Sequence, residues 1–329
     1  MSFTIMRTGV GSLPSVSTIK TLQKLGVKVV GVDCNPLSIG FYFADIGYCI
    51  PKAEEPGYIP TLLKICKKEK VNAILPAVDE ELVVLANHKD ELEKKGIFVV
   101  VARKEVVETC FDKFKTYNFF IQNNIPTPIT FDALKVNLDK TTYPKIIKPR
   151  FGRGQHDVYK INNRKELKFF REYVKKPLLQ DYIEGQEYTI DILADFNSKV
   201  ICVVPRKRLE VESGISTKGI TTYKKEIIDS CIDIVKKLGI IGPANIQCFM
   251  DKNNKLLFTE INPRLAGGVA LSVAAGSNIL LNLVKLLKGE EVEECFDFKE
   301  DLLMLRYLAE RFIKKDEIKD FNIGNTLAI

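Results

Sequence analysis

The stretch 243–268, PANIQCFMDKNNKLLFTEINPRLAGG, holds the pattern that decides the fold of this chain. Two apolar runs, 246–250 and 256–261, flank the polar turn signal DKNNK, and this arrangement predicts a β-hairpin. Asparagine tolerates the positive φ angles of a type I′ turn, so we expect Asn253 and Asn254 to form a two-residue loop. The loop length sets the register of the two strands.

Four polar side chains of this hairpin are expected to share one surface. The loop places Gln247 directly opposite Glu260, with Cβ atoms about 5 Å apart. Because side chains alternate between the faces of a strand, Asn262 joins them and Arg264 projects near the same edge. Three oxygen donors of this kind suit Mg²⁺, and an arginine beside them suits a transferring phosphoryl group. A hairpin with a solvated polar face explains these residues equally well, and a one-residue slip in register would scatter them.

Composition and charge narrow the class of protein. The 329 residues, 46% hydrophobic and 28% charged, suit two or three globular domains. The net charge of +7 is spread along the chain, which favours anionic ligands such as nucleotides and is too weak to indicate nucleic acid. Two histidines exclude a histidine-rich zinc site.

Cysteine usage and hydropathy predict a cytoplasmic protein. The eight cysteines show no C-x-x-C spacing, which is typical of a reduced compartment, and no basic region followed by an apolar stretch marks a secretory signal. Only residues 265–287 approach membrane length, and polar residues interrupt them. We therefore expect a buried helix pair there and no membrane partner.

Residues 1–105 alternate between short apolar runs and segments with helical spacing, which predicts a parallel, doubly wound sheet. The expected strands are 4–10, 28–32, 73–76 and 97–101, and the expected helices are 15–25, 58–70 and 80–95.

The first turn of this sheet, GVGSLP at 9–14, resembles a dinucleotide fingerprint when Asp33 is added, but Pro14 takes the place of the third glycine. This partial motif supports a rival hypothesis, an NAD-dependent oxidoreductase. The alternative is a sheet that shapes a substrate pocket at the carboxyl ends of its strands, where Gly11, Asp33 and Glu80 lie. Glu80 also fits a first-turn helix carboxylate that complements the helix dipole.

A second unit follows a boundary near residue 105 and an extended linker at 125–128. Lys148 ends a strand and precedes the loop PRFGRGQHD at 149–157, whose glycines free backbone N–H groups to line a phosphate. A solvated hairpin is about as compatible with this loop. The expected elements of the unit are strands 145–148, 158–161 and 178–182 and helix 165–175.

The remaining chain is expected to form strands at 188–193 and 200–204 and a helix at 226–238 before the opening hairpin. Residues 205–222 are polar, basic and poor in apolar side chains, which predicts a mobile loop over a site. Residues 150–157 and 207–220 are then expected to close over a bound anion.

Lys113, Lys148 with its glycine loop, the segment 180–187 and the polar set of the hairpin occur in an order that resembles the ATP-grasp superfamily. The resemblance is closest to the carbamoyl-phosphate-synthase-like branch of single-chain proteins. It implies an α/β and α+β architecture, in which a Rossmann-like pre-ATP-grasp domain (1–105) precedes a two-subdomain ATP-grasp domain (106–329). The small lid subdomain would span about 113–185, and the metal-binding subdomain about 186–329.

The resemblance also implies ATP and Mg²⁺ as cofactors, with Mn²⁺ as an alternative, and gives each motif a role. Lys148 and Arg264 would act directly on the reacting phosphates. The implied residues are Lys113, Lys148, Gly152, Arg153 and Gly154 at the phosphates, Gln180, Asp181, Tyr182 and Ile183 at adenine, Glu187 at the ribose, Gln247, Glu260 and Asn262 at the metal, and Arg264 at the transferring group.

The function that the resemblance implies is ligation of a small-molecule carboxylate to an amine. The reaction would pass through an acyl phosphate and release ADP and phosphate. The resemblance allows a homodimer, and we expect no nucleic-acid or membrane partner. Besides the oxidoreductase, a non-catalytic ATP-binding module is the remaining alternative, although it would leave a group aimed at a transferring phosphoryl without a purpose.

Overall fold

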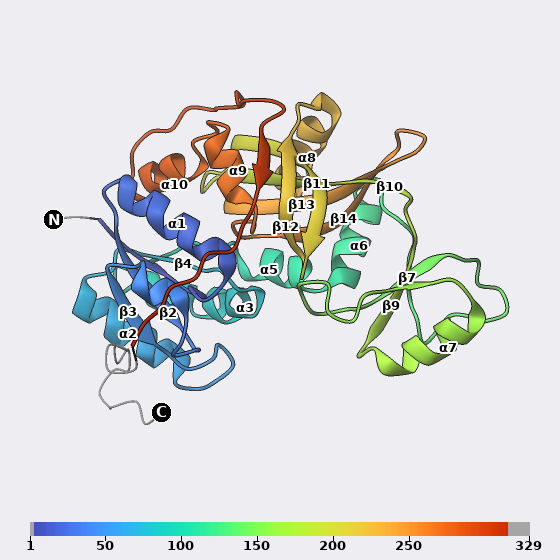
Figure 1. Ribbon diagram of the computed structural model, residues 1–329, viewed down its shortest axis with the longest axis horizontal. Helices are drawn as coiled ribbons and strands as arrows, with labels where there is room; N and C mark the ends of the chain where they lie inside the picture. Colours follow the sequence, from blue (N-terminus) through green and yellow to red (C-terminus); the bar gives the residue numbers. More distant parts are fainter. Residues whose placement is uncertain (1–2, 315–329) are drawn as a thin grey trace.

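The computed structural model describes residues 3–314, which form three β-sheets with helices packed on them (Figure 1). The N-terminal sheet has five parallel strands in the order β3-β2-β1-β4-β5, which confirms the doubly wound prediction. Helix α1 packs on one face and helices α2 and α3 on the other. The elements are β1 (Thr4–Arg7), α1 (Leu13–Lys24), β2 (Lys28–Asp33), η1 (Ile39–Tyr42), β3 (Ile46–Cys49), α2 (Tyr58–Glu69), β4 (Ala73–Leu75), α3 (Asp79–Asn87), α4 (Lys89–Glu93) and β5 (Phe98–Val99).

Two details of this sheet differ from the sequence prediction. Strand β3 and the short helix η1 were not predicted, because the four residues of β3 include a glycine and form no continuous apolar run. The helix expected at 80–95 is two helices, since the backbone leaves helical geometry at His88, where φ is −110° and ψ is 10°. The edges of the other predicted elements shift by a few residues.

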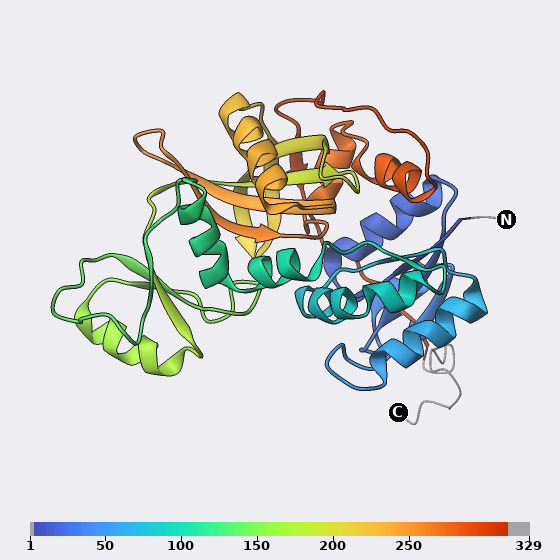
Figure 2. The same cartoon turned by 180° about the vertical axis from the view of Figure 1, so that it is seen from behind.

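The smallest sheet lies at the opposite end of the molecule from the N-terminal sheet (Figure 1). Its strands pair antiparallel in the order β6-β9-β7-β8, and helix α7 covers one face with its buried Leu167. Helices α5 and α6 lie between the N-terminal sheet and this one (Figure 2). The bounds are α5 (Lys104–Phe111), α6 (Lys113–Gln122), β6 (Thr130–Asp132), β7 (Lys145–Pro149), β8 (Tyr159–Ile161), α7 (Arg164–Tyr173) and β9 (Pro177–Asp181).

The third sheet is antiparallel with the order β14-β13-β10-β11-β12-β15. One face packs on helix α8, whose buried side chains follow helical spacing. The opposite face is apolar towards helix α10 and polar where it borders the cleft described below. The bounds are β10 (Gly185–Ala194), β11 (Val200–Glu212), β12 (Ile215–Thr221), α8 (Lys225–Leu238), β13 (Gly242–Asp251), β14 (Leu256–Asn262), α9 (Val269–Ala274), α10 (Ile279–Leu287) and β15 (Leu303–Leu305).

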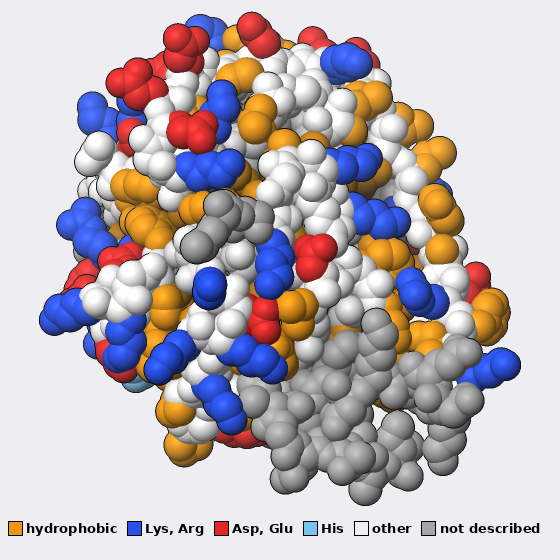
Figure 3. Space-filling view, turned by 90° about the vertical axis from the view of Figure 1, so that its left-hand side faces the viewer, with side chains coloured by type: hydrophobic (Ala, Val, Ile, Leu, Met, Phe, Trp, Pro, Cys, Tyr) orange, Lys and Arg blue, Asp and Glu red, His pale blue; other side chains and the backbone are white. Residues whose placement is uncertain are grey.

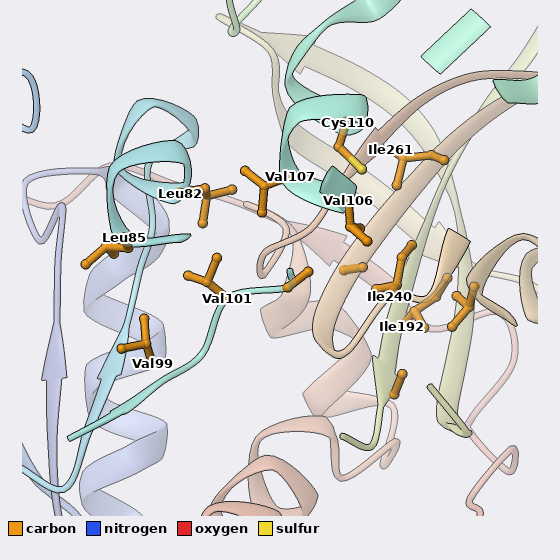
Figure 4. Packing of buried hydrophobic residues seen from close by; sticks show 14 of the residues in the cluster. Leu82, Leu85, Val99, Val101, Val106, Val107, Cys110, Ile192, Ile240 and Ile261 are labelled. Carbon is orange, nitrogen blue, oxygen red and sulfur yellow. The ribbon is translucent and has the colours of Figure 1, made fainter. Parts of the chain in front are cut away.

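A continuous apolar core joins the N-terminal sheet to the third sheet. Leu82 of α3, Val107 of α5 and Ile261 of β14 belong to the same buried cluster (Figure 4). Helix α5 therefore contacts both parts, although it begins at the predicted boundary near residue 105. The three sheets occupy 4–99, 130–181 and 185–305, and the exact domain limits given above stay predictions.

The β13–β14 hairpin has the predicted pairing at Gln247 and Glu260, but its loop differs from the prediction. Gln247 lies opposite Glu260, as expected. The loop has three residues, 252–254, and Asn254 alone among them has a positive φ, 60°. The Asp251 carboxylate accepts hydrogen bonds from two backbone N–H groups of the turn, which favours this wider loop. A β-bulge at Thr259 then shifts the register back by one residue.

The prediction that residues 205–222 form a loop is wrong. These residues form most of β11 and β12, joined by a turn at Ser213 and Gly214 with φ angles of 48° and 76°. The segment is poor in apolar side chains, and its buried arginines, Arg206 and Arg208, form ion pairs with carboxylates of β10. The basic residues of this segment were therefore predicted to be exposed to solvent, although Arg206 and Arg208 are buried in ion pairs.

The predicted helix pair at 265–287 is confirmed as α9 and α10, and within residues 3–314 no helix is long and apolar enough to cross a membrane. On the face that carries part of the N-terminal sheet, basic and acidic side chains are intermixed (Figure 3). This agrees with the dispersed charge of the sequence.

Candidate active site

The polar end of the third sheet brings the predicted metal ligands together. Gln247 and Glu260 are cross-strand partners, and Asn245 pairs with Asn262 one step further along. The Asn262 amide donates to Asn245 Oδ1 at 3.3 Å, which orients it. Within the described residues no three His, Cys, Asp or Glu side chains cluster as metal ligands. One carboxylate with two amide oxygens nevertheless fits Mg²⁺, because this ion keeps positions for phosphate oxygens and water.

Arg264 lines the same cavity as Gln247 and Glu260, but it is not a free cation. Its Nε and Nη2 donate to Asp79 at 2.6 and 2.8 Å, in a forked ion pair that joins the segment after β14 to the start of α3. Burial would raise the pKa of Asp79, but the guanidinium outweighs this effect and lowers it. Asp79 was not predicted as a partner of Arg264, because 185 residues separate the two along the chain.

The two lysines approach the same place from other elements. Lys148 on β7 donates to Gln180 Oε1 at 2.9 Å, and Lys113 at the start of α6 lies 3.6 Å from Glu260 Oε1. Burial lowers the pKa of Lys148 to about 8, although Glu260 opposes the shift. Both ammonium groups face a cavity between the small sheet and the β13–β14 hairpin, which the loop at 152–156 also lines. A buried cation of this kind is suited to a phosphate oxygen.

The glycine-rich loop is held by contacts on both sides. Gly152 has a φ of 134° and its carbonyl accepts from Lys113 at 2.5 Å. Arg153 lies 3.4 Å from Glu80 of α3. Gly154 meets the tip of the β11–β12 hairpin so closely that a Cβ on Gly214 would lie 2.6 Å from its Cα. The predicted phosphate loop therefore contacts the hairpin that was expected to be a mobile loop.

The predicted adenine and ribose residues divide into two groups. Gln180 and Glu187 line the cavity, whereas the side chains of Asp181 and Tyr182 point to Lys145 and Lys160. Ile183 lies in the link between β9 and β10. The resemblance implies an adenine contact largely through backbone groups, so Asp181 and Tyr182 need not point into the cavity.

Glu187 is already engaged in an ion pair, since Arg208 Nη1 lies 2.7 Å from its Oε1. Burial raises the pKa of Glu187 even so. Next to it, Arg206 and Asp191 form a fully buried pair with two bonds of 2.8 Å, and Ser272 also donates to Asp191. Arg206 and Arg208 line the cleft and were missed. Their spacing of two residues, which puts both on one face of a strand, was the available signal.

In the N-terminal turn, the backbone N–H of Gly11 that a dinucleotide would need is already hydrogen-bonded within the protein. The Gly11 N–H donates to Asp33 Oδ2 at 2.7 Å, and Asp33 Oδ1 accepts from the Asn35 N–H at 2.9 Å. An amide that would meet a pyrophosphate is thus bonded to the carboxylate that would meet the ribose. Pro14 opens α1 as expected. Asp33 and Glu80 line a separate cavity at this edge of the sheet.

A cleft with buried cations, amide oxygens and a carboxylate between two antiparallel sheets is typical of enzymes that transfer a phosphoryl group. The comparisons with known proteins define the class further. Residues 8–100 match the family model "PylC-like, N-terminal domain", and residues 174–309 match "ATP-grasp in the biosynthetic pathway with Ter operon".

Curated relatives agree with these family models. A D-alanine–D-alanine ligase of Petrotoga mobilis is 30% identical over 211 residues, which cover 60% of this chain and 70% of that protein. A carbamoyl-phosphate synthase of Methanobrevibacter smithii is 24% identical over 82% of this chain and 77% of its own length. The carbamoyl phosphate synthase large chain of Thermoplasma volcanium is 26% identical over 84% of this chain, which spans only 28% of that protein. The chain belongs to the ATP-grasp superfamily.

Solved structures share the fold. The N5-carboxyaminoimidazole synthetase of Staphylococcus aureus, complexed with ADP, has a TM-score of 0.74 at 18% identity and covers 91% of this chain and 81% of its own. The biotin carboxylase domain of the Hydrogenobacter thermophilus 2-oxoglutarate carboxylase, with MgADP and bicarbonate, has a TM-score of 0.73 at 18% identity over 91% and 73%. These structures show the fold, and the class comes from the family model and the 30% identical ligase: the chain is an ATP-grasp ligase. The oxidoreductase alternative finds no support among the relatives named here.

Proposed function

We propose that this protein joins a small-molecule carboxylate to an amine with Mg²⁺-ATP, through an acyl phosphate. The observation that carries the proposal is the convergence of Lys113, Lys148, Gln247 and Glu260 on one cavity. These residues come from four elements, α6, β7, β13 and β14, and the first two are about a hundred residues from the hairpin, so a solvated polar face does not account for their meeting. The ADP and MgADP complexes of structures with this fold support the choice of nucleotide and metal.

The residues of the chain have distinct roles in this proposal. Glu260, with the amide oxygens of Gln247 and Asn262, would hold Mg²⁺, which when bound neutralises charge on the phosphate oxygens. Lys148 and Lys113 stabilise the negative charge that builds on the transferring group, and Arg264 adds a cation at its edge. Gly152, Arg153 and Gly154 surround the phosphates from the other side, and Gln180 to Glu187 receive the nucleoside.

The proposed reaction has two steps. The substrate carboxylate oxygen attacks the γ-phosphorus, and the bond to ADP breaks, which leaves an acyl phosphate and ADP. The amine nitrogen then attacks the acyl carbon, the bond to phosphate breaks, and the nitrogen loses a proton as the amide forms. We place the protein in the cytoplasm and allow it to form a homodimer. Size-exclusion chromatography with light scattering tests the oligomeric state.

The test of the proposal is a screen for ADP release. The purified protein with Mg²⁺-ATP is offered amino acids, small carboxylates and bicarbonate, with and without amine acceptors, and hydroxylamine traps an acyl phosphate as the hydroxamate. We expect carboxylate-dependent ADP and hydroxamate in equal amounts. The variant Lys148→Met is the matched blank, because it removes the buried cation and is expected to keep the fold, which its melting temperature checks. Release of AMP and pyrophosphate would contradict the acyl-phosphate route.

A further inference from the structure

A cavity of about 760 Å³ lies on the small sheet, outside the nucleotide cleft. Its lining comes from the edge strand β6, the segment 134–142 that follows this strand, and the start of β9, and we name it the β6 cavity. None of the residues expected to hold ATP or Mg²⁺ lines it. The volume falls within the range of roughly 300–1,000 Å³ that is typical of small-molecule sites.

The small sheet and its helix carry the excess charge of the chain. Residues 130–181 contain thirteen lysines and arginines against six aspartates and glutamates. This excess of seven equals the net charge of the whole chain, which has 49 basic and 42 acidic residues. The remaining residues are balanced, in agreement with the mixed charges of the face in Figure 3. The positive charge is therefore concentrated in this part and not spread along the chain as predicted, which favours an anionic partner here.

The β6 cavity gathers several of these cations. Five lysine and arginine side chains line it against one carboxylate, Asp132. Lys135 and Lys145 face neighbouring carboxylates. Lys140 and Lys176 have no ion-pair partner within residues 3–314, although both line the cavity. These two ammonium groups are available to a bound anion.

Arg150 connects the β6 cavity to a lysine of the nucleotide cleft. Its Nε and Nη2 donate to Asp112 at 2.7 and 2.6 Å, whereas its Nη1 has no hydrogen-bond partner within residues 3–314. Asp112 caps α6 by accepting from the backbone N–H groups of Phe114 and Lys115, and Lys113 is the first residue of that helix. The Lys113 N–H also donates to the Arg150 carbonyl at 3.1 Å. An anion bound to Arg150 therefore acts on the cap that positions Lys113.

Apolar side chains form the rest of the β6 cavity. Phe131 on β6 and Leu134 just after it are 49% and 55% exposed, and the buried Leu178 of β9 lies on the same lining. Covering exposed apolar surface is favourable, so a ligand with an apolar body gains free energy here beyond its charge. The lining thus fits a molecule with an anionic head and an apolar body.

We propose that the β6 cavity binds an organic anion with an apolar body, a carboxylate or a phosphate ester, as an effector of nucleotide binding. Lys140, Lys176 and Arg150 take the head group, because ammonium and guanidinium groups only donate and the head group only accepts. The anion shares Arg150 with Asp112, which loosens the cap of α6 and should weaken nucleotide binding. The inference goes beyond the proposed function, since the cavity holds none of the reacting groups.

The test of the site is displacement of the fluorescent anion 1-anilinonaphthalene-8-sulfonate from the full chain. Octanoate, octyl phosphate and octanol serve as competitors that share one alkyl chain and differ in the head group. We expect both anions to displace the dye at least about fivefold more effectively than octanol. The more effective anion identifies the head group as a carboxylate or a phosphate. Displacement by octanol at equal concentration, or no displacement at all, would overturn the proposal.

Substitutions locate the bound anion. The double variant Lys140→Gln, Lys176→Gln should weaken octanoate about tenfold, and Leu134→Ser should weaken it several-fold. Lys165→Gln on α7 and Ile121→Ser on α6 are the matched controls, because both side chains are exposed and lie outside the cavity lining. All four proteins should keep the melting temperature of the wild type. Unchanged octanoate affinity in the two cavity variants would place the anion elsewhere and contradict the assignment.

Calorimetry with MgADP tests the effector role. Saturating octanoate should raise the Kd of MgADP about threefold, and saturating MgADP should weaken octanoate by the same factor and no further. An octanoate affinity that keeps falling as MgADP rises would show direct competition in the nucleotide cleft and remove the separate site. An unchanged Kd of MgADP would remove the effector role. Absence of MgADP binding would remove the proposed ligase function and the effector role together, whereas octanoate binding is still decided by the cavity variants.

Discussion

Two hairpins flank β10 in the third sheet and turn polar side chains to the same cleft, yet they use their charges differently. On β13–β14, Glu260 is 25% exposed and meets Lys113 at 3.6 Å, beside the amides of Gln247 and Asn262. On β11–β12, Arg206 and Arg208 are tied to carboxylates of β10 at 2.7–2.8 Å and are nearly inaccessible. The first hairpin leaves oxygen atoms available to a ligand, and the second has its charges satisfied.

This difference shows that some polar residues facing the cleft contribute to folding stability, whereas others are available for ligand binding. A charge that is buried and paired determines stability, because removal of its partner leaves an uncompensated ion. A carboxylate that faces open space contributes little to folding and can be reserved for a ligand. Substitutions on the two hairpins should therefore separate loss of fold from loss of activity.

The largest expected effect is that of Asp191→Asn, which leaves Arg206 buried without its counter-ion. We expect the free energy of unfolding to fall by about 3–5 kcal/mol, measured by urea denaturation. The double variant Asp191→Asn, Arg206→Met should recover part of this loss. Glu210→Gln, which alters the exposed pair with Lys218, is the control and should cause no measurable change. A small effect at Asp191 would contradict the distinction between the hairpins.

Glu260→Gln should lower the rate of turnover and leave the stability of the fold unchanged. Loss of one preorganised charge at a phosphoryl-transfer site is expected to lower ADP release by about 10²–10³-fold. The melting temperature should be unchanged within error. Glu212→Gln, at the exposed end of β11, is the same chemical change on the other hairpin and should retain full activity. Magnesium-dependent turnover that survives Glu260→Gln would remove Glu260 from the site.

Glu81 extends the comparison to α3, where a carboxyl is buried without a direct ion pair in the described residues. Burial raises its pKa from 4.5 to about 7. A raised carboxyl pKa means that stability is fully present below pH 4.5 and is lost as pH rises through 7. Glu81→Gln should match the wild type at pH 4.5 and exceed its unfolding free energy by up to roughly 3 kcal/mol at pH 8. Urea denaturation at both pH values measures this, and a difference independent of pH would contradict it.

The smallest expected effect concerns the contact between the hairpin tip and the phosphate loop. Gly214→Ala adds strain at a φ of 76° and drives a methyl group into Gly154. We expect a loss of about 1–2 kcal/mol in stability and a several-fold rise in the KM for ATP. Gly26 has the same φ of 76° with nothing within 4 Å, so Gly26→Ala controls for backbone strain. Equal KM values in the two variants would show that the contact does not shape the nucleotide site.

The sequence predicted the meeting of Gln247 and Glu260 for a partly wrong reason. The expected two-residue loop is one residue longer in the structure, and the bulge at Thr259 removes the resulting offset. Hydrophobic alternation favours the register that keeps Ile246 and Ile261 buried, whichever way the turn is made. The face of each strand was therefore predictable, and the path between the strands was not.

The elements that sequence reasoning missed depend on partners distant along the chain. Arg206 and Arg208 looked solvated because the carboxylates that bury them belong to β10. Arg264 was placed at the correct edge, but its forked ion pair with Asp79 requires the start of α3 to lie against the end of the β13–β14 hairpin. Local periodicity predicted where most strands and helices lie, whereas ion pairs between elements follow from the packing of the sheets. The roles assigned to the site residues remain predictions.

The three consecutive carboxylates at the start of α3 have a consequence for protein engineering. Asp79 forms an ion pair with Arg264, just after the β13–β14 hairpin, and Glu80 forms one with Arg153 of the glycine-rich loop. Glu81 lines the cavity at the carboxyl edge of the N-terminal sheet. One helical turn thus connects the N-terminal sheet to two separate parts of the ATP-grasp domain. A chimera that exchanges residues 1–105 between relatives would have to carry compatible partners at 153 and 264. Without compatible residues at 153 and 264, we expect the N-terminal sheet and the ATP-grasp domain to fold but to lose the ion pairs that fix their relative position.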